Sequence, residues 1–142
     1  MQLADHIRKA RQIQNKLSHP SCAAVIVAAG SSARMGGTDK ILAELGGLPV
    51  LSRTLRVFDD HDMIDTIIVV AREEQMPKIS RVCSPYHKVR IVVPGGNSRQ
   101  ESVMHGLEAV PEETELVAVH DGARPLVSPE VITKAILKAA KF

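Results

Sequence analysis

An apolar run without polar alternation, Ala23–Val27, opens the part of this sequence that is richest in structural signals. Five consecutive apolar residues are typical of a strand covered on both faces, as in a parallel sheet. Three further strands are predicted at 67–71, 89–93 and 116–119, and segments with helical signals separate them. Strands that alternate with helices indicate right-handed crossovers. The sequence therefore predicts an α/β fold with a Rossmann-like, doubly wound and mostly parallel sheet.

The N-terminal segment carries apolar residues such as Leu3 and Ile7 at helical spacing, with basic residues on its other faces. This pattern predicts an amphipathic helix over 1–17. We expect residues 1–21 to form this helix and a linker, ahead of a domain that occupies 22–142. Packing on the domain or on a partner chain is the expected role, because one basic helix without aromatic residues binds bilayers weakly.

Turn and cap signals predict the other helices. Gly46 and Gly47 mark a turn, and Pro49 suits the first turn of the helix that follows it. Ser98 can cap another helix, and Glu101, three residues later, completes a capping box. The predicted helices between and after the strands cover 49–58, 73–82, 98–110 and 128–140.

A turn of small residues with two cations behind it follows the first predicted strand. The small residues are Ala28, Ala29, Gly30, Ser31 and Ser32, and the cations are Arg34 and Lys40. Small side chains let a ligand reach the backbone, whose N–H groups can hold an anion. A guanidinium and an ammonium beside such a turn suit a polyphosphate. The alternatives are a turn that binds nothing and cations that contact only water, and the segment lacks the order of a Walker A loop.

Two more unusual loops follow later strands. The segment PGGNSRQES comes after the third strand, and HDGARP comes after the fourth. Ligands of such sheets bind beyond the carboxyl ends of the strands, which lie at one edge. We therefore expect the three loops to meet there and to form a phosphate or nucleotide site.

Composition excludes several classes of partner. The chain of 142 residues is 44% hydrophobic and 24% charged, with eighteen basic and sixteen acidic residues, so its net charge is +2. That balance, with one Tyr, two Phe and no Trp, argues against a nucleic acid polymer as the ligand. No apolar run approaches the roughly 20 residues of a membrane helix. Two cysteines without metal or disulfide spacing favour a reducing, cytoplasmic location.

Three segments together resemble a known family: AAGSSARMGGTDK, GGNSRQESVMHGL and VHDGARP. They are similar to the signature segments of 2-C-methyl-D-erythritol 4-phosphate cytidylyltransferases, and the resemblance runs from Cys22 to the end of the chain. It implies a nucleotidyltransferase of non-mevalonate isoprenoid biosynthesis that makes CDP-methylerythritol and pyrophosphate. Ribitol 5-phosphate cytidylyltransferases share a similar set, and molybdopterin nucleotidyltransferases share the first segment, so both remain alternatives.

The resemblance also implies roles for individual residues. The nucleotide-binding residues would be Ala28, Ala29, Gly30, Ser31, Ser32, Gly96, Asn97, Ser102 and Gly122. Arg34 and Lys40 would be catalytic, because they would neutralise the triphosphate. Asp121 would lie near a Mg²⁺ ion, and Arg124 would lie on the side of the sugar-alcohol phosphate, the second substrate beside CTP. The alternative for Asn97 is an ordinary turn former.

Length is the main departure from the family, whose members run on for roughly eighty to ninety residues more, a usual domain length. The resemblance thus implies a C-terminally truncated domain with negligible turnover, and a homodimer for the full-length form. The interval from Arg34 to Lys40 is also one residue shorter than usual. A non-catalytic nucleotide-binding module, with the N-terminal helix as a recruiting element, is the alternative of another class.

Overall fold

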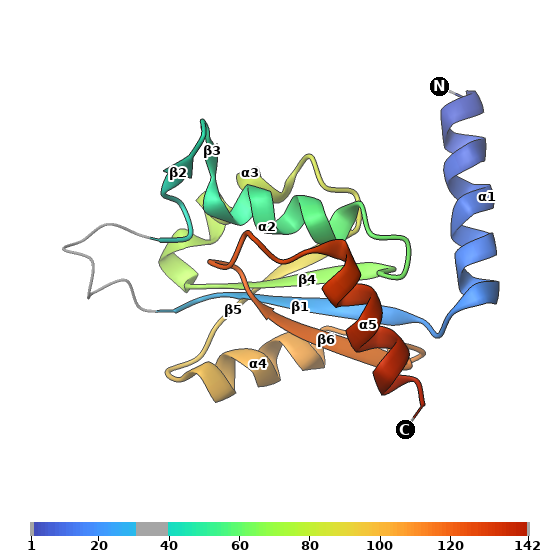
Figure 1. Cartoon of the computed structure of the whole chain (residues 1–142). Coiled ribbons are helices and arrows are strands. Elements are labelled where there is room, and N and C mark those ends of the chain that lie inside the picture. The colour runs from blue at the N-terminus through green and yellow to red at the C-terminus, as the bar shows by residue number, and fades with distance from the viewer. Residues whose placement is uncertain (1, 31–39, 142) are drawn as a thin grey trace.

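A four-stranded parallel sheet forms the centre of the molecule (Figure 1). The computed structural model describes residues 2–30 and 40–141, and the side chains of 12–18 are not described. In the spatial order of the sheet, the strands are β5 (Val89–Pro94), β4 (Thr66–Ala71), β1 (Cys22–Ala28) and β6 (Leu116–Asp121). Every pairing in this sheet is parallel, so the prediction of a parallel α/β fold is confirmed.

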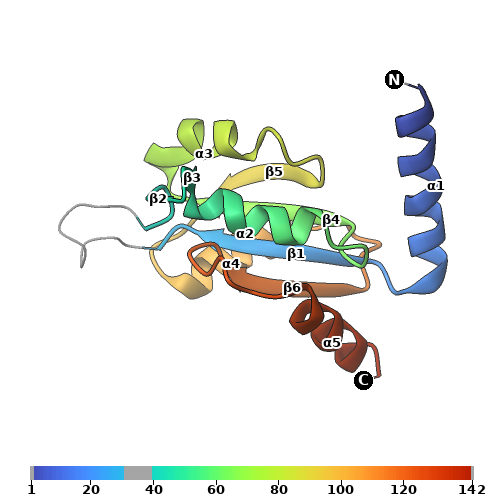
Figure 2. The same cartoon turned by 45° about the horizontal axis from the view of Figure 1, so that its top comes forward.

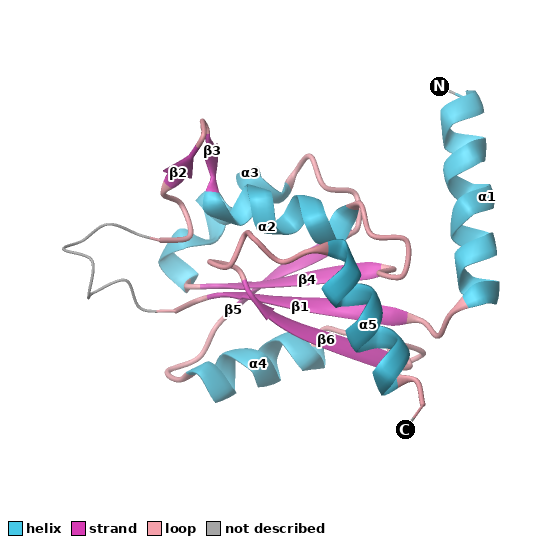
Figure 3. Ribbon diagram, viewed as in Figure 1, coloured by secondary structure: helices cyan, strands magenta, loops and turns pink. Residues whose placement is uncertain are grey.

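Helices cover both faces of this sheet, as Figures 1, 2 and 3 show from two directions. They are α2 (Val50–Asp59), the short 3₁₀ helix η2 (Glu73–Gln75), α3 (Met76–Cys83), α4 (Arg99–Glu108) and α5 (Pro129–Ala139). The helix predicted at 73–82 is thus a 3₁₀ turn followed by α3, whose first turn contains Pro77. Proline suits that position because its missing N–H needs no partner there.

Two cores lie on opposite faces of the sheet. The larger core joins one face of β1 to α2, α3 and α5, and its side chains include Ile26, Leu55, Phe58 and Ile79, all almost completely buried. The smaller core joins the other face of β1, through Val25 and its neighbours, to α4. Among the described residues, α2, α3 and α5 lie on one face and α4 lies on the other, so the arrangement is doubly wound, as predicted.

A small hairpin, which the sequence did not predict, precedes α2. Its strands are β2 (Glu44–Leu45) and β3 (Leu48–Pro49), and Gly46 and Gly47 between them have φ of 63° and 87°. Two left-handed residues in succession are the signature of a tight hairpin turn. Pro49 consequently ends β3 and caps α2, rather than lying in the first turn of that helix.

The N-terminal helix α1 (Gln2–Ser18) projects away from the sheet beside the amino end of β1 (Figures 1 and 2). Leu3 is 73% exposed and Ile7 is 54% exposed, so the apolar face of this helix contacts solvent there. The amphipathic helix of the prediction is present. Within residues 2–30 and 40–141, no helix combines the length and the apolar character that a membrane crossing requires.

Candidate functional site

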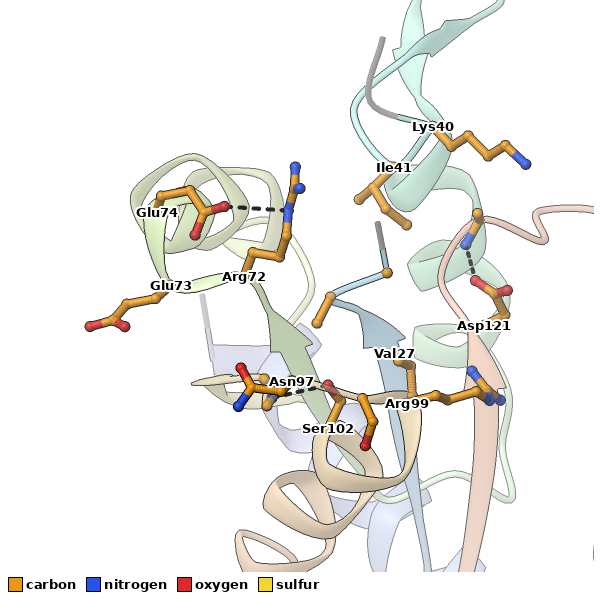
Figure 4. Close-up of a pocket in the computed structure, with 16 residues that line it drawn as sticks. Val27, Lys40, Ile41, Arg72, Glu73, Glu74, Asn97, Arg99, Ser102 and Asp121 are labelled. Atoms are coloured by element: carbon orange, nitrogen blue, oxygen red, sulfur yellow. Dashed lines mark hydrogen bonds and ion pairs between the residues drawn. The ribbon is translucent and has the colours of Figure 1, made fainter. Parts of the chain in front are cut away.

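The three loops that follow β1, β5 and β6 meet at one pocket of about 740 Å³ (Figure 4). It lies beyond the carboxyl ends of the strands, where the doubly wound topology places ligands. Its lining residues are Val27, Ala29, Gly30, Lys40, Ile41, Arg72, Glu73, Glu74, Gly95, Gly96, Asn97, Ser98, Arg99, Ser102, Asp121 and Ala123. The predicted convergence of the three loops is therefore confirmed.

The predicted site residues fall into three groups in the structure. Those that line the pocket are Ala29, Gly30, Lys40, Gly96, Asn97, Ser102 and Asp121. Those outside its lining are Ala28, Gly122 and Arg124. The remaining predicted residues, Ser31, Ser32 and Arg34, lie outside the part of the chain that the structure describes.

Ala28 and Gly122 support the pocket from behind. Ala28 is the last residue of β1 and packs in the larger core with 1% of its surface exposed. Gly122 N–H donates to the carbonyl of Val27 at 2.9 Å, and its own carbonyl accepts from Thr54 Oγ1 at 2.8 Å. Gly122 is thus tied to the core on both sides of its backbone.

Arg124 does not line the pocket, and its side chain is largely exposed. Its guanidinium Nε lies 3.9 Å from Asp121 Oδ2, and 79% of the side chain is exposed. An ion pair that exposed contributes little to stability. Arg124 therefore lies next to the pocket-lining carboxylate of Asp121 without lining the pocket itself.

The Gly95–Asn97 loop commits its backbone amides to the protein. Gly95 N–H donates to the carbonyl of Ala71 at 2.8 Å, and Gly96 N–H donates to Ser102 Oγ at 3.1 Å. Asn97 N–H donates to Glu101 Oε2 at 2.7 Å. Because these three amides already have protein partners, the loop differs from a phosphate-binding nest, which presents amide donors.

Gly95 also fixes the contact between two of the loops. A Cβ at Gly95 would lie 2.5 Å from Ala29 Cβ and 2.8 Å from Ser102 Oγ, closer than real atoms approach. Only glycine lets the loop after β5 pack directly against the loop after β1. Ser102, at 3% exposure, lies behind this contact, as Figure 4 shows beside Asn97.

Asp121 and His120 face in opposite directions at the end of β6. Asp121 lines the pocket and its Oδ1 accepts from Ala123 N–H at 2.9 Å. The His120 ring packs on Phe58 with ring centroids 5.0 Å apart, and its Nε2 lies 3.0 Å from the Arg124 carbonyl. Alternation along the strand separates the two side chains, so they form no acid/base pair, as the sequence suggests.

Asp121 brings a carboxylate to the pocket, which is a ligand type that Mg²⁺ accepts. One carboxylate together with substrate phosphates is the usual way in which proteins hold Mg²⁺. Among residues 2–30 and 40–141, no group of three His, Cys, Asp or Glu side chains is arranged as a metal site.

Charged residues after β4, which the sequence analysis did not assign to the site, form another wall of the pocket. Arg72, Glu73 and Glu74 line it, and Arg72 Nε lies 3.6 Å from Glu74 Oε1 (Figure 4). Because parallel strands end at the same edge of a sheet, the loop after β4 could have been predicted to reach the pocket. It lacks the small residues that mark the other three loops. Arg99, in the first turn of α4, adds a further cation.

Comparison with known proteins places residues 22–141 in one family, because the model of the 2-C-methyl-D-erythritol 4-phosphate cytidylyltransferases matches them. A protein of that name from Dehalococcoides mccartyi is 48% identical over 121 residues, which are 84% of this chain and 52% of the relative. Another from Clostridium tetani is 38% identical over 122 residues, or 84% of this chain and 49% of the relative. The chain spans about half the length of the curated relatives it matches.

Solved structures show the same likeness. The 4-diphosphocytidyl-2C-methyl-D-erythritol synthase of Anaerococcus prevotii superposes with a TM-score of 0.76 at 34% identity, over 86% of this chain and 52% of that one. A second synthase of this name gives a TM-score of 0.72 at 28% identity, over 87% and 56% of the two chains. The shared fold, the match across 22–141 and the loop pocket lead to one conclusion: the chain belongs to the 2-C-methyl-D-erythritol 4-phosphate cytidylyltransferase family.

Proposed function

We propose that this chain binds CTP in the loop pocket and forms the nucleotide-binding half of a cytidylyltransferase. The acceptor would be 2-C-methyl-D-erythritol 4-phosphate, and the products would be CDP-methylerythritol and pyrophosphate. One observation carries the proposal: three loops that the family resemblance identifies line a single pocket at the carboxyl edge of the sheet. Nucleotides bind at that edge in doubly wound folds.

The pocket divides into a base side and a phosphate side. The Gly95–Asn97 loop offers acceptors, which suit the amino group of cytosine, and the Asn97 side chain carries both a donor and an acceptor. Lys40 lines the pocket and brings a positive charge to it. We assign Lys40 and Arg34 to the triphosphate, and Ser31 and Ser32 to the turn that encloses it.

In the reaction, an oxygen of the acceptor phosphate would attack the α-phosphorus of CTP. The bond from the α-phosphorus to the oxygen that bridges to the β-phosphate would break, and its electron pair would leave on pyrophosphate. Such transfers depend on positioning and charge neutralisation rather than on a protein nucleophile. Lys40 and Arg34 would hold the triphosphate and stabilise the charge that develops on it.

Asp121 would hold a Mg²⁺ ion, which shares the negative charge of the triphosphate when it is bound. Arg124 at the rim of the pocket would face the phosphate of the acceptor. Because the chain spans about half the length of its relatives, we expect these 142 residues alone to bind nucleotide with negligible turnover.

Calorimetric titration of the chain with CTP, UTP and GTP in the presence of Mg²⁺ tests the proposal. We expect clear preference for CTP. Equal affinity for the three nucleotides would refute the assignment and favour a general nucleotide-binding module or a relative of the molybdopterin enzymes. Pyrophosphate release by the full-length gene product with methylerythritol phosphate or ribitol phosphate then identifies the acceptor.

A further inference from the structure

Arg72 is the first residue beyond β4, and the backbone just before it is held on both sides. Ala71 pairs with Ala28 of β1 and with Pro94 of β5. Its carbonyl also accepts from Gly95 N–H at 2.8 Å. Because the loops that follow β1 and β5 both line the pocket, Arg72 leaves the sheet between two of its walls, and it lines the pocket itself.

Two side chains of the short helix η2 orient the guanidinium of Arg72. Its Nε donates to Gln75 Oε1 at 3.3 Å and lies 3.6 Å from Glu74 Oε1. Figure 4 shows the guanidinium pointing toward the side of the pocket that carries Lys40, and away from Asn97. A guanidinium has five N–H donors in a rigid fork, and these two contacts involve the donor at Nε.

The ion pair between Arg72 and Glu74 is loose. Its Nε–Oε1 distance of 3.6 Å exceeds the roughly 2.7–2.9 Å of a charge-assisted hydrogen bond. The Glu74 side chain is 70% exposed, and an ion pair with so exposed a partner contributes little to stability. A phosphate presents oxygens that match the guanidinium fork bidentately. A phosphate can therefore replace the Glu74 carboxylate at little cost to the fold.

We propose that Arg72 binds a phosphate group of the nucleotide, a role that rests on the proposed binding of CTP. The phosphates are the groups of CTP that carry negative charge, so they attract a guanidinium more strongly than the base or the ribose does. The guanidinium also points to the side of the pocket that carries Lys40, the cation assigned to the triphosphate. Glu74 acts in the opposite sense, because its carboxylate competes with the phosphate for Arg72 in the ligand-free chain.

Calorimetric titration of single variants with CTP in the presence of Mg²⁺ tests this role. We expect R72A to lower CTP affinity about tenfold, the effect of one lost charge-assisted contact. E74Q should raise CTP affinity about threefold, because a neutral amide competes less for the guanidinium. Arg81, an exposed residue in the last turn of α3, provides the matched control R81A, which should bind CTP as wild type does.

The two variants separate phosphate binding from a merely structural ion pair. Both break the same pair, so a structural role would change CTP affinity in the same direction in R72A and E74Q. The loss in R72A should also shrink to less than threefold in 1 M NaCl, because salt screens a contact between charges. E74Q leaves Arg72 in place and so tests the role even where R72A does not fold.

Equal CTP affinity of R72A and R81A, or an E74Q affinity no higher than that of wild type, would overturn the role of Arg72 and leave the proposed function standing. Equal affinity of the wild-type chain for CTP, UTP and GTP would overturn the proposed function alone, because R72A still reports on the phosphates that the three nucleotides share. A wild-type chain that binds none of them would overturn both.

Discussion

Thr54 Oγ1 donates a 2.8 Å hydrogen bond to the carbonyl of Gly122, a residue 68 positions later in the chain. Thr54 is completely buried in α2, and Gly122 follows β6 in the loop that carries Asp121. The bond joins the core helix to the backbone between Asp121 and Ala123, two residues that line the pocket. The Thr54 hydroxyl should therefore contribute both to the stability of the fold and to the position of the loop that follows β6.

Replacing Thr54 with valine removes that hydroxyl at nearly constant volume. We expect T54V to lower the free energy of unfolding by about 1–3 kcal/mol, because the buried Gly122 carbonyl loses its partner. T54S keeps the hydroxyl and loses one methyl group, which costs about 0.8 kcal/mol. Urea denaturation measures both. A valine variant more stable than the serine variant would contradict the importance of this bond.

Replacing Gly95 with alanine should separate two walls of the pocket. Because the new Cβ would overlap Ala29 Cβ and Ser102 Oγ, we expect G95A to lose about 1–3 kcal/mol of stability. Its affinity for CTP should fall at least tenfold, a loss of about 1.4 kcal/mol in binding. For the unfolding measurement the control is G30A, since no described atom lies within 4 Å of a Cβ at Gly30. Equal stability of the two variants would argue against the close packing of the loops.

Removing the charge of Lys40 should weaken the binding of triphosphate more than that of monophosphate. We expect K40A to reduce CTP affinity about tenfold, the effect of one lost charge-assisted contact. Its affinity for CMP should change much less, because CMP lacks the β- and γ-phosphates. Calorimetry of both ligands gives the comparison, and K134A, at an exposed position of α5, is the control. A parallel loss of CMP binding would place Lys40 elsewhere on the ligand.

His61 should make stability depend on pH. Its ring is buried, with Nδ1 accepting from Met63 N–H and Nε2 lying 2.9 Å from Thr133 Oγ1. Burial lowers the pKa of His61 below its ordinary value of 6.5. The neutral ring therefore contributes fully above about pH 6.5, and its contribution is lost as the pH falls toward the lowered pKa of the folded state.

Urea denaturation at several values of pH measures this effect. We expect the free energy of unfolding to decrease below about pH 6.5 in wild type. H61Q should show a shallower decrease, although it is less stable at pH 8, because it removes the titrating ring. H87Q, at an exposed histidine, controls for the loss of an imidazole. An equal slope in H61Q and H87Q would rule out His61 as the source.

The sequence predicted the strands well because burial on both faces leaves a strong local pattern. Ala23–Val27 lies wholly within β1, and the sequence also predicts that the loop after this strand reaches the site. The neighbours of β1 in the sheet were not predictable in the same way. β1 pairs with β4 on one side and with β6 on the other, and the sequence of a single segment does not indicate which strands become its neighbours.

The sequence prediction was incomplete where a strand was too short to show an alternating pattern, and where the sequence did not indicate which way a side chain points. The strands of the β2–β3 hairpin have two residues each, too few to alternate visibly, although Gly46-Gly47 was a usable signal for a tight turn. The side chain of Ala28, a predicted nucleotide-binding residue, packs in the larger core, and its role at the ligand stays a prediction. Family motifs specify which segments form a site and not which way each residue of a segment faces.

The central position of β1 has a consequence for biosynthesis. Its partner β6 is formed by Leu116–Asp121, almost ninety residues later, so a strand that is buried along its whole length emerges long before it can pair with β6. Non-local parallel pairing slows folding, and an unpaired apolar strand invites aggregation in the interval. Nascent chains that stop short of Leu116 should therefore need chaperone protection, whereas those that include β6 can close the sheet around β1.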